Sequence, residues 1–231
     1  MYNEQGIYHV DIVMCIDATG SMRPCINAVK ESALTFYESF TEEMAVAGKD
    51  VAKLRIKVIA FRDFGAVHSE AYAALEESPF FELPEDAEAF KSFVEGIRPK
   101  GGGGDGPESA LEAIATAMKS DFTTEGMKQR HVILVFTDAA ALPLDKHADK
   151  EGYPVGMPKD LAELGAWWEG ESQEFSGTYK RKAGRLVAFA PKKEPWTVME
   201  SWNRYWPAYT TSVGLADVDM ATVFDLLVGS C

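Results

Sequence analysis

The sequence lacks the features that mark several classes of protein. It contains only three cysteines, Cys15, Cys25 and Cys231, and an odd number does not suit a disulfide framework. No apolar run is long enough to span a membrane, and the first residues lack the basic start and apolar stretch of a secretory signal. We therefore expect a protein of the reducing cytoplasm.

Basic residues are also in short supply. Lys and Arg number 23 against 36 Asp and Glu, which gives a net charge of −13. Nucleic-acid binding depends on cations that meet phosphates, and docking on anionic lipid needs them too, so we expect neither partner. The 231 residues suit one α/β domain. With no repeat, low-complexity tract or linker, we predict a single domain over 1–231 with a long loop or insertion around 139–185.

An apolar run near the start of the chain ends in a cluster of oxygen-bearing side chains. Residues 12–16 read Ile-Val-Met-Cys-Ile and predict a buried strand. Asp17, Thr19 and Ser21 follow in the turn that leads to a helical pattern. In α/β sheets, ligands bind at the carboxyl ends of the strands, and Mg²⁺ and Mn²⁺ prefer carboxylate, hydroxyl and water ligands.

Two further clusters occupy the same kind of position. A run of four glycines precedes Asp105, Pro107 and Glu108; Pro107 suits the first position of a helix, which places both acids at a helix entrance. Residues 132–136 form another apolar run, which ends in Thr-Asp at Asp138. Each acid could simply cap a helix or end a strand. The recurrence of the pattern in three segments favours a shared metal site.

The three motifs in this order resemble the von Willebrand factor type A domain, which carries a metal-ion-dependent adhesion site. That site is built from a D-x-S/T-x-S loop and two further loops. The resemblance covers nearly the whole chain and implies these metal ligands: Asp17, Thr19 and Ser21 in the first loop, Asp105 or Glu108 in the second, and Asp138 in the third.

The second loop departs from the commonest pattern of the family, in which this position is Thr. The Asp-Gly-Pro-Glu run resembles the loop of integrin β-subunit domains, where the Glu binds the metal, and this favours Glu108. By its distance from Ala110 and Leu111, however, Asp105 lies nearer the usual Thr position. The choice between Asp105 and Glu108 stays open.

The remaining pattern alternates strands with helices, which predicts a doubly wound, mainly parallel sheet with helices on both faces, a Rossmann-like fold. The expected helices lie at 26–40, at 85–97, from Pro107, from a cap at Asp160, at 196–205 and from a cap at Asp217; the expected strands lie at 54–61, 80–83, 132–136, 186–190 and 209–213. Residues 139–160 are expected to form a long loop.

Other polar and aromatic residues receive plainer interpretations. Asp63, at a strand end, is expected in a surface turn or an Arg–Asp ion pair. Asp145, His147 and Asp149 suit a solvated loop. Most tryptophans are expected in the core, whereas an exposed Trp167–Trp168 pair would mark a partner surface.

The resemblance implies a binding module and not an enzyme. Mg²⁺, or Mn²⁺ or Ca²⁺, would leave one coordination position open for an acidic side chain of a protein partner. Intracellular bacterial members of the family that stand alone occur in stress-response systems beside a Ser/Thr kinase and a phosphatase, and other A domains are attached to alpha-kinases. We therefore expect a signalling or stress-response complex, with a Ser/Thr kinase or phosphatase as the candidate partner.

Two other classes of function compete with this one. A Mg-dependent hydrolase or phosphatase could use Asp17 as nucleophile, but the haloacid-dehalogenase pattern needs a second Asp two residues later, where this chain has Thr19. Hydrolysis by metal-bound water would need a general base, and none of the four histidines is tied to the clusters. The other class is a scaffold whose metal is purely structural.

Overall fold

The computed structural model describes residues 7–32, 35–65, 73–99, 106–210 and 220–231. A seven-stranded sheet runs through it in the order β3-β2-β1-β5-β6-β7, and β4 also pairs with β2. The strands are β1 (Ile7–Asp17), β2 (Asp50–Phe61), β3 (Leu75–Glu77), β4 (Phe81–Leu83), β5 (Lys128–Phe136), β6 (Gly184–Pro191) and β7 (Tyr205–Thr210).

The predicted parallel sheet is confirmed for its centre. β1 pairs in parallel with β2 and β5, and β6 continues in parallel to β7, while the short β3 and β4 run antiparallel to β2. Residues 10–17 of β1 are all buried, as expected for a central strand covered on both faces. Parallel pairing brings the carboxyl ends of β1 and β5 together, because Ile16 lies opposite Phe136.

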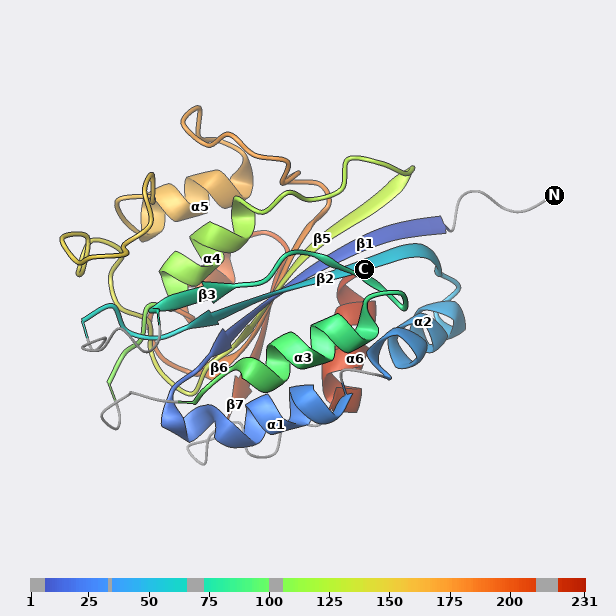
Figure 1. The fold of residues 1–231 in the computed structure, drawn as a ribbon. Coiled ribbons are helices and arrows are strands. Elements are labelled where there is room, and N and C mark those ends of the chain that lie inside the picture. The colour runs from blue at the N-terminus through green and yellow to red at the C-terminus, as the bar shows by residue number, and fades with distance from the viewer. Residues whose placement is uncertain (1–6, 33–34, 66–72, 100–105, 211–219) are drawn as a thin grey trace.

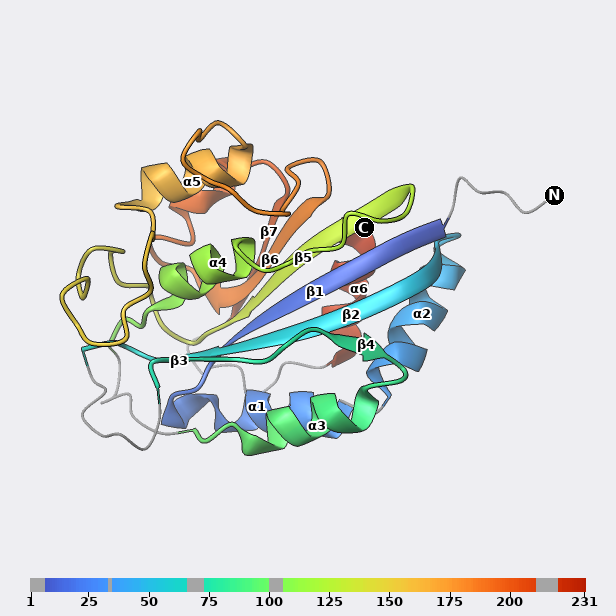
Figure 2. The same ribbon diagram turned by 45° about the horizontal axis from the view of Figure 1, so that its top comes forward.

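Two groups of helices cover the two faces of the sheet (Figures 1 and 2). One face carries α1 (Arg23–Ser32), α2 (Phe36–Val46), α3 (Ala87–Gly96) and α6 (Met220–Ser230); the other carries α4 (Ala110–Met118) and α5 (Leu161–Glu169). Alternate residues of β1 enter the two cores, Met14 and Ile16 on the first face and Val13 and Cys15 on the second, as strand geometry requires. No helix in the described ranges has the length and apolarity to cross a membrane.

The single helix predicted over 26–40 is wrong. The chain forms α1 and then α2, with Thr35 in a turn between them. The neighbours of the two helices differ in part, since α1 lies against α3 and α2 lies against β2, while both contact α6. Tertiary packing has overridden a continuous helical pattern.

The helix predicted over 196–205 is also wrong. Only a short 3₁₀ helix, η3 (Val198–Ser201), forms there. Trp202 is extended, and Arg204 has a positive φ of 58°. The carbonyl of Arg204 then accepts a hydrogen bond from Leu186 N–H (3.0 Å), so pairing with β6 draws this segment into β7. Of the last predicted strand, 209–213, the residues up to Thr210 belong to β7. The rest of that strand and the predicted helix cap Asp217 lie outside the described residues.

Several local predictions are confirmed. Asp160 caps α5, and its Oδ1 accepts a hydrogen bond from Glu163 N–H (2.8 Å). Cys15 is a fully buried core residue. Residues 139–160 form neither helix nor strand; we refer to them as the 139–160 loop, which lies beside α4 and α5 in both views (Figures 1 and 2). Trp167 and Trp168 are buried, so they do not mark an exposed partner surface.

Candidate metal site

The first loop gathers three oxygen-bearing side chains at the end of β1. Oδ1 of Asp17 accepts a hydrogen bond from Thr19 N–H (2.9 Å), and the hydroxyl oxygens of Thr19 and Ser21 are 3.3 Å apart. Asp17 and Thr19 are buried, and Ser21 is exposed. Thr19 takes the N-cap position of the 3₁₀ helix η2 (Gly20–Met22), yet its side chain makes no capping bond. Its hydroxyl is therefore not committed to the capping role.

The third loop meets the first because β5 lies beside β1. The hydroxyl of Thr137 donates to Oδ2 of Asp17 (2.9 Å) and accepts from Ala139 N–H (3.1 Å). Thr137 is thus the residue that joins the two loops, with the half-buried Asp138 next to it. Thr137 is not among the site residues predicted from the sequence. Its position directly before Asp138, at the end of an apolar strand, is the sequence feature that could have indicated a role in the site.

The second loop contributes Glu108, in a conformation that differs from the prediction. The helix begins at Ala110 and not at Pro107, because the backbone of Glu108 forms a bridge with Ala141. Glu108 N–H donates to Ala140 O (2.9 Å), and Glu108 O accepts from Leu142 N–H (2.9 Å). The second and third loops are therefore joined through their backbones. Asp105, the other candidate in this loop, lies outside the described residues.

The Glu108 carboxyl group is buried, and one of its two oxygens lacks a hydrogen-bond partner. The residue is 4% exposed, and its Oε2 has no hydrogen-bond partner. Burial, together with the charges of Asp17, Asp63 and Asp138, raises the pKa of Glu108 to about 8. Burial also raises the pKa of Asp17 to about 6, with Asp138 adding to the shift. Carboxyl groups are thus crowded where three loops meet, and a bound cation would stabilise their ionised forms.

The donor chemistry fits a hard divalent cation. Among the described residues, no three His, Cys, Asp or Glu side chains are placed to hold a metal by themselves. The donors available are instead a mixture of carboxylates and hydroxyls, Asp17, Thr19, Ser21, Glu108 and Asp138, which is the type that Mg²⁺ and Mn²⁺ accept together with water. The unpartnered Oε2 of Glu108 is a buried acceptor that such an ion would satisfy.

Asp63 lies close to this charge cluster at the start of a turn, which is one of the two predicted alternatives. Its Oδ1 is 3.0 Å from Nε2 of His147 and accepts from Gly65 N–H (2.8 Å). Arg62 pairs instead with Glu76 (2.7 Å), so the expected Arg–Asp pair does not form. His147 is half-buried and ties the 139–160 loop to the end of β2. No local sequence pattern links Asp63 to a histidine so far along the chain.

A second buried glutamate, Glu112, lies in the first turn of α4, four residues after Glu108. Glu112 is 1% exposed; its Oε1 is 3.3 Å from the hydroxyl oxygen of Tyr153, while its Oε2 has no partner. Burial raises its pKa to about 7. Glu112 was not predicted as a buried group, because a glutamate in a helical pattern normally faces solvent.

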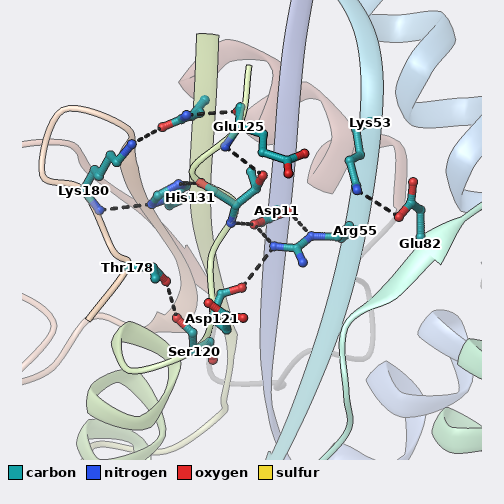
Figure 3. Close-up of polar contacts among 12 residues, drawn as sticks. Asp11, Lys53, Arg55, Glu82, Ser120, Asp121, Glu125, His131, Thr178 and Lys180 are labelled. Carbon is teal, nitrogen blue, oxygen red and sulfur yellow. Dashed lines mark hydrogen bonds and ion pairs between the residues drawn. The ribbon is translucent and has the colours of Figure 1, made fainter. Parts of the chain in front are cut away.

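A separate polar network lies farther back in the same strands (Figure 3). Asp11 accepts two hydrogen bonds from Arg55 (2.8 and 2.6 Å) and one from Thr123 N–H (2.6 Å). His131 lies next to Asp11 on β5, 3.0 Å from Thr123 O, and accepts from Lys180 N–H (3.1 Å). Because these groups satisfy one another, the network is structural, unlike the under-bonded cluster at the strand ends.

Comparison with known proteins supports the fold. A scan of protein-family models and a search of curated proteins found no match. Among solved structures, the chain is similar to the pilus adhesin SpaC from Lactobacillus rhamnosus GG, with a TM-score of 0.54 at 10% identity over 97% of this chain and 31% of the adhesin. It is similar to proximal thread matrix protein 1 from the mussel byssus, in a structure with a zinc-occupied MIDAS motif, with a TM-score of 0.53 at 15% identity.

That likeness covers 96% of this chain and 48% of the mussel protein, so the chain spans less than half the length of either neighbour. At these identities the comparison concerns the fold. The architecture is an α/β, Rossmann-like one of the von Willebrand factor A type, as the sequence predicted.

Proposed function

We propose that the protein is a divalent-metal-dependent protein-binding module, whose partner supplies an acidic side chain to the metal. The observation that carries the proposal is the meeting of three loops at the carboxyl ends of the central strands, with the Asp17 carboxylate, the hydroxyls of Thr19 and Ser21 and an unpartnered Glu108 oxygen. When bound, the cation would supply an open coordination position for a carboxylate. The zinc-occupied site of the mussel protein supports a metal at the corresponding place in the fold.

The residues of the candidate metal site would have two roles, as metal ligands and as groups that orient those ligands. Asp17, Thr19 and Ser21 would hold the ion from the first loop, with Glu108 and Asp138 direct or water-mediated ligands from the others. Thr137 orients Asp17 through its hydrogen bond to Oδ2. Such supporting contacts fix the geometry of ligands and tune their affinity. Asp105 remains a candidate for the second loop.

The first experiment is calorimetric titration of Mg²⁺, Mn²⁺, Ca²⁺ and Zn²⁺ into metal-stripped protein. We expect saturable binding to the wild type and its loss in Asp17→Ala. Asp149→Ala is the matched control, because Asp149 is an exposed carboxylate in the 139–160 loop. Absence of binding in the wild type, or equal binding by Asp17→Ala, would overturn the assignment of the site.

The second experiment tests the role of the partner carboxylate. Bound Mn²⁺ enhances the relaxation of water protons through the waters that it coordinates. We expect a glutamate-containing peptide to reduce this enhancement by replacing water, and the same peptide with glutamine to leave it unchanged. A bound ion whose relaxation signal neither peptide alters would instead indicate a structural metal with a closed coordination shell.

The biological setting is a further part of the proposal. The motifs resemble those of intracellular bacterial modules, which supports a signalling or stress-response complex with a Ser/Thr kinase or phosphatase. The fold neighbours are an adhesin and a thread matrix protein, which supports an adhesion-type role for the same site. Both settings use a metal-dependent contact between proteins, and neither requires catalysis.

A further inference from the structure

A cavity of about 480 Å³ lies next to the candidate metal site, between the 139–160 loop and the start of α5. Its walls are mainly apolar and include Leu111, Leu142, Leu144, Leu161 and Pro195. The volume falls within the range of roughly 300–1,000 Å³ that is typical of ligand pockets. The cavity can therefore hold a large apolar side chain together with neighbouring atoms of a bound segment.

The cavity begins where the candidate metal site ends. Ala141, which lines the cavity, is bridged to Glu108, and Leu111 follows Glu108 at the start of α4. Ala141 lies three residues after Asp138, so at most about 11 Å of extended backbone separates them. A partner segment that contacts the metal can reach the cavity with about three residues of its own.

The walls of the cavity are held in place without a ligand. Leu142 N–H donates to Glu108 O (2.9 Å), the hydroxyl of Tyr153 donates to Leu144 O, and Trp196 Nε1–H donates to Ala139 O (3.1 Å). An irregular loop that is fixed at so many points keeps its hollow open. A preformed pocket binds without a further ordering cost.

The rim of the cavity is acidic. Asp145 and Glu194 are exposed carboxylates at the rim, and within the described residues neither has an ion-pair partner. Asp160 is committed to capping α5, and Lys159 is the one cation among the lining residues. Such a rim disfavours a second acidic group and favours a positive charge beside an apolar group.

We propose that this cavity receives an apolar side chain of the partner segment, about three residues from its metal-binding acid and beside a Lys or Arg that faces Asp145 and Glu194. The acidic contact rests on the proposed function. The apolar and basic contacts rest on the cavity itself. The recognised chemistry is thus a peptide with an acidic residue, a short spacer and an apolar–basic pair.

The test is a selection from a displayed library of random linear peptides, performed in Mg²⁺ and again in EDTA. The variant Asp145→Lys/Glu194→Lys reverses the rim charge without touching the core. The matched control is Glu151→Lys/Glu174→Lys, which makes the same change of charge at two exposed residues outside the cavity lining. Calorimetry with Mg²⁺ and circular dichroism establish that both variants keep the metal site and the fold.

We expect wild type and control to select the apolar–basic pair in Mg²⁺, and the rim variant to lose the basic residue. Replacing the selected apolar residue with Ala should weaken binding by about tenfold or more, because a buried aliphatic side chain contributes that much. Failure of the proposed metal-dependent function would give a different result: the selected peptides would lack the acidic residue and would keep the apolar–basic pair even in EDTA.

Selection of acidic peptides that lack an apolar preference would overturn the cavity proposal and leave the metal proposal standing. The cavity proposal alone is likewise overturned if the rim variant selects the same apolar–basic pair as the wild type. Recovery of no binding peptide at all would overturn both proposals.

Discussion

Removing the buried carboxylate of Asp11 should destabilise the fold far more than removing a neighbouring exposed one. Both acids pair with cations of β2, Asp11 with Arg55 and Glu82 with Lys53 (3.1 Å) (Figure 3). Asp11 is completely buried, whereas the Glu82 side chain is 48% exposed. The two pairs are close together in one sheet, so they make a matched comparison of the same kind of interaction at different burial.

The magnitude follows from the partners that each change leaves behind. Asp11→Ala removes the carboxylate partner of Arg55 and the acceptor of the Thr123 N–H, while Arg55 keeps its hydrogen bond to Asp121 O (3.0 Å) and its contact with the Phe80 ring. Breaking a buried ion pair costs about 3–5 kcal/mol; because the Arg55 side chain keeps 19% exposure and water reaches it, we expect about 3 kcal/mol. Glu82→Gln removes an exposed pair of the kind worth ~0–1 kcal/mol.

The assay is urea unfolding followed by tryptophan fluorescence and circular dichroism, with coincident transitions as the condition for a two-state treatment. We expect the midpoint to fall strongly for Asp11→Ala and little for Glu82→Gln, at an unchanged slope. Similar losses for the two variants, or a loss below about 1 kcal/mol for Asp11→Ala, would refute the idea that burial of the network stabilises this end of the sheet.

Three further predictions concern other parts of the molecule. Burial lowers the pKa of His131 to about 4, below the ordinary value of ~6.5, so the unfolded chain binds more protons at this residue and its contribution to stability should fall by roughly 2 kcal/mol from pH 7 to pH 5. The raised pKa values of Asp17, Glu108 and Glu112 act in the opposite direction, so the test is the difference in stability between wild type and His131→Gln in urea, which should be smaller at pH 5 than at pH 7; an unchanged difference would contradict the prediction. Thr137→Val removes the hydrogen bond to Asp17 and should weaken Mg²⁺ binding by about tenfold, measured by calorimetry; unaltered affinity would mean that Thr137 does not orient the ligand. Gly184→Ala places a methyl group against the Tyr179 hydroxyl and should cost about 1–3 kcal/mol in urea unfolding; Tyr179→Phe should recover part of the loss, and no recovery would point to another cause.

The central strands could be predicted because their signal is local. The apolar runs at 12–16, 132–136 and 186–190 lie within β1, β5 and β6, and buried parallel strands carry this pattern. Their polar amino-terminal ends could not be predicted, because Asp11 and His131 are buried only through the network that they form together.

The elements that failed depend on contacts between distant segments. Glu108 forms a bridge rather than a helical turn because Ala141 is its backbone partner. The segment at 196–205 becomes a 3₁₀ turn and a strand because β6 offers a free edge to β7. Helical spacing alone cannot reveal such partners.

The site shows the same division. The positions of Asp17, Thr19 and Asp138 at strand ends follow from apolar runs and parallel topology. The contact of Thr137 with Asp17 and that of Glu112 with Tyr153 could not be predicted, because each joins residues that are far apart in the sequence. Whether these residues bind metal stays a prediction that the titration tests.

The backbone bridge between Glu108 and Ala141 makes the two proposed contacts of the partner energetically reciprocal. Glu108 belongs to the candidate metal site, and Ala141 lines the cavity. If the cation stabilises one arrangement of the two bridged loops, and the partner segment binds that arrangement better, the cation raises the affinity for the segment. By thermodynamic linkage, the segment then raises the affinity for the cation by the same factor. Cation affinity measured with and without a bound segment would then differ by the same factor as segment affinity measured with and without the cation.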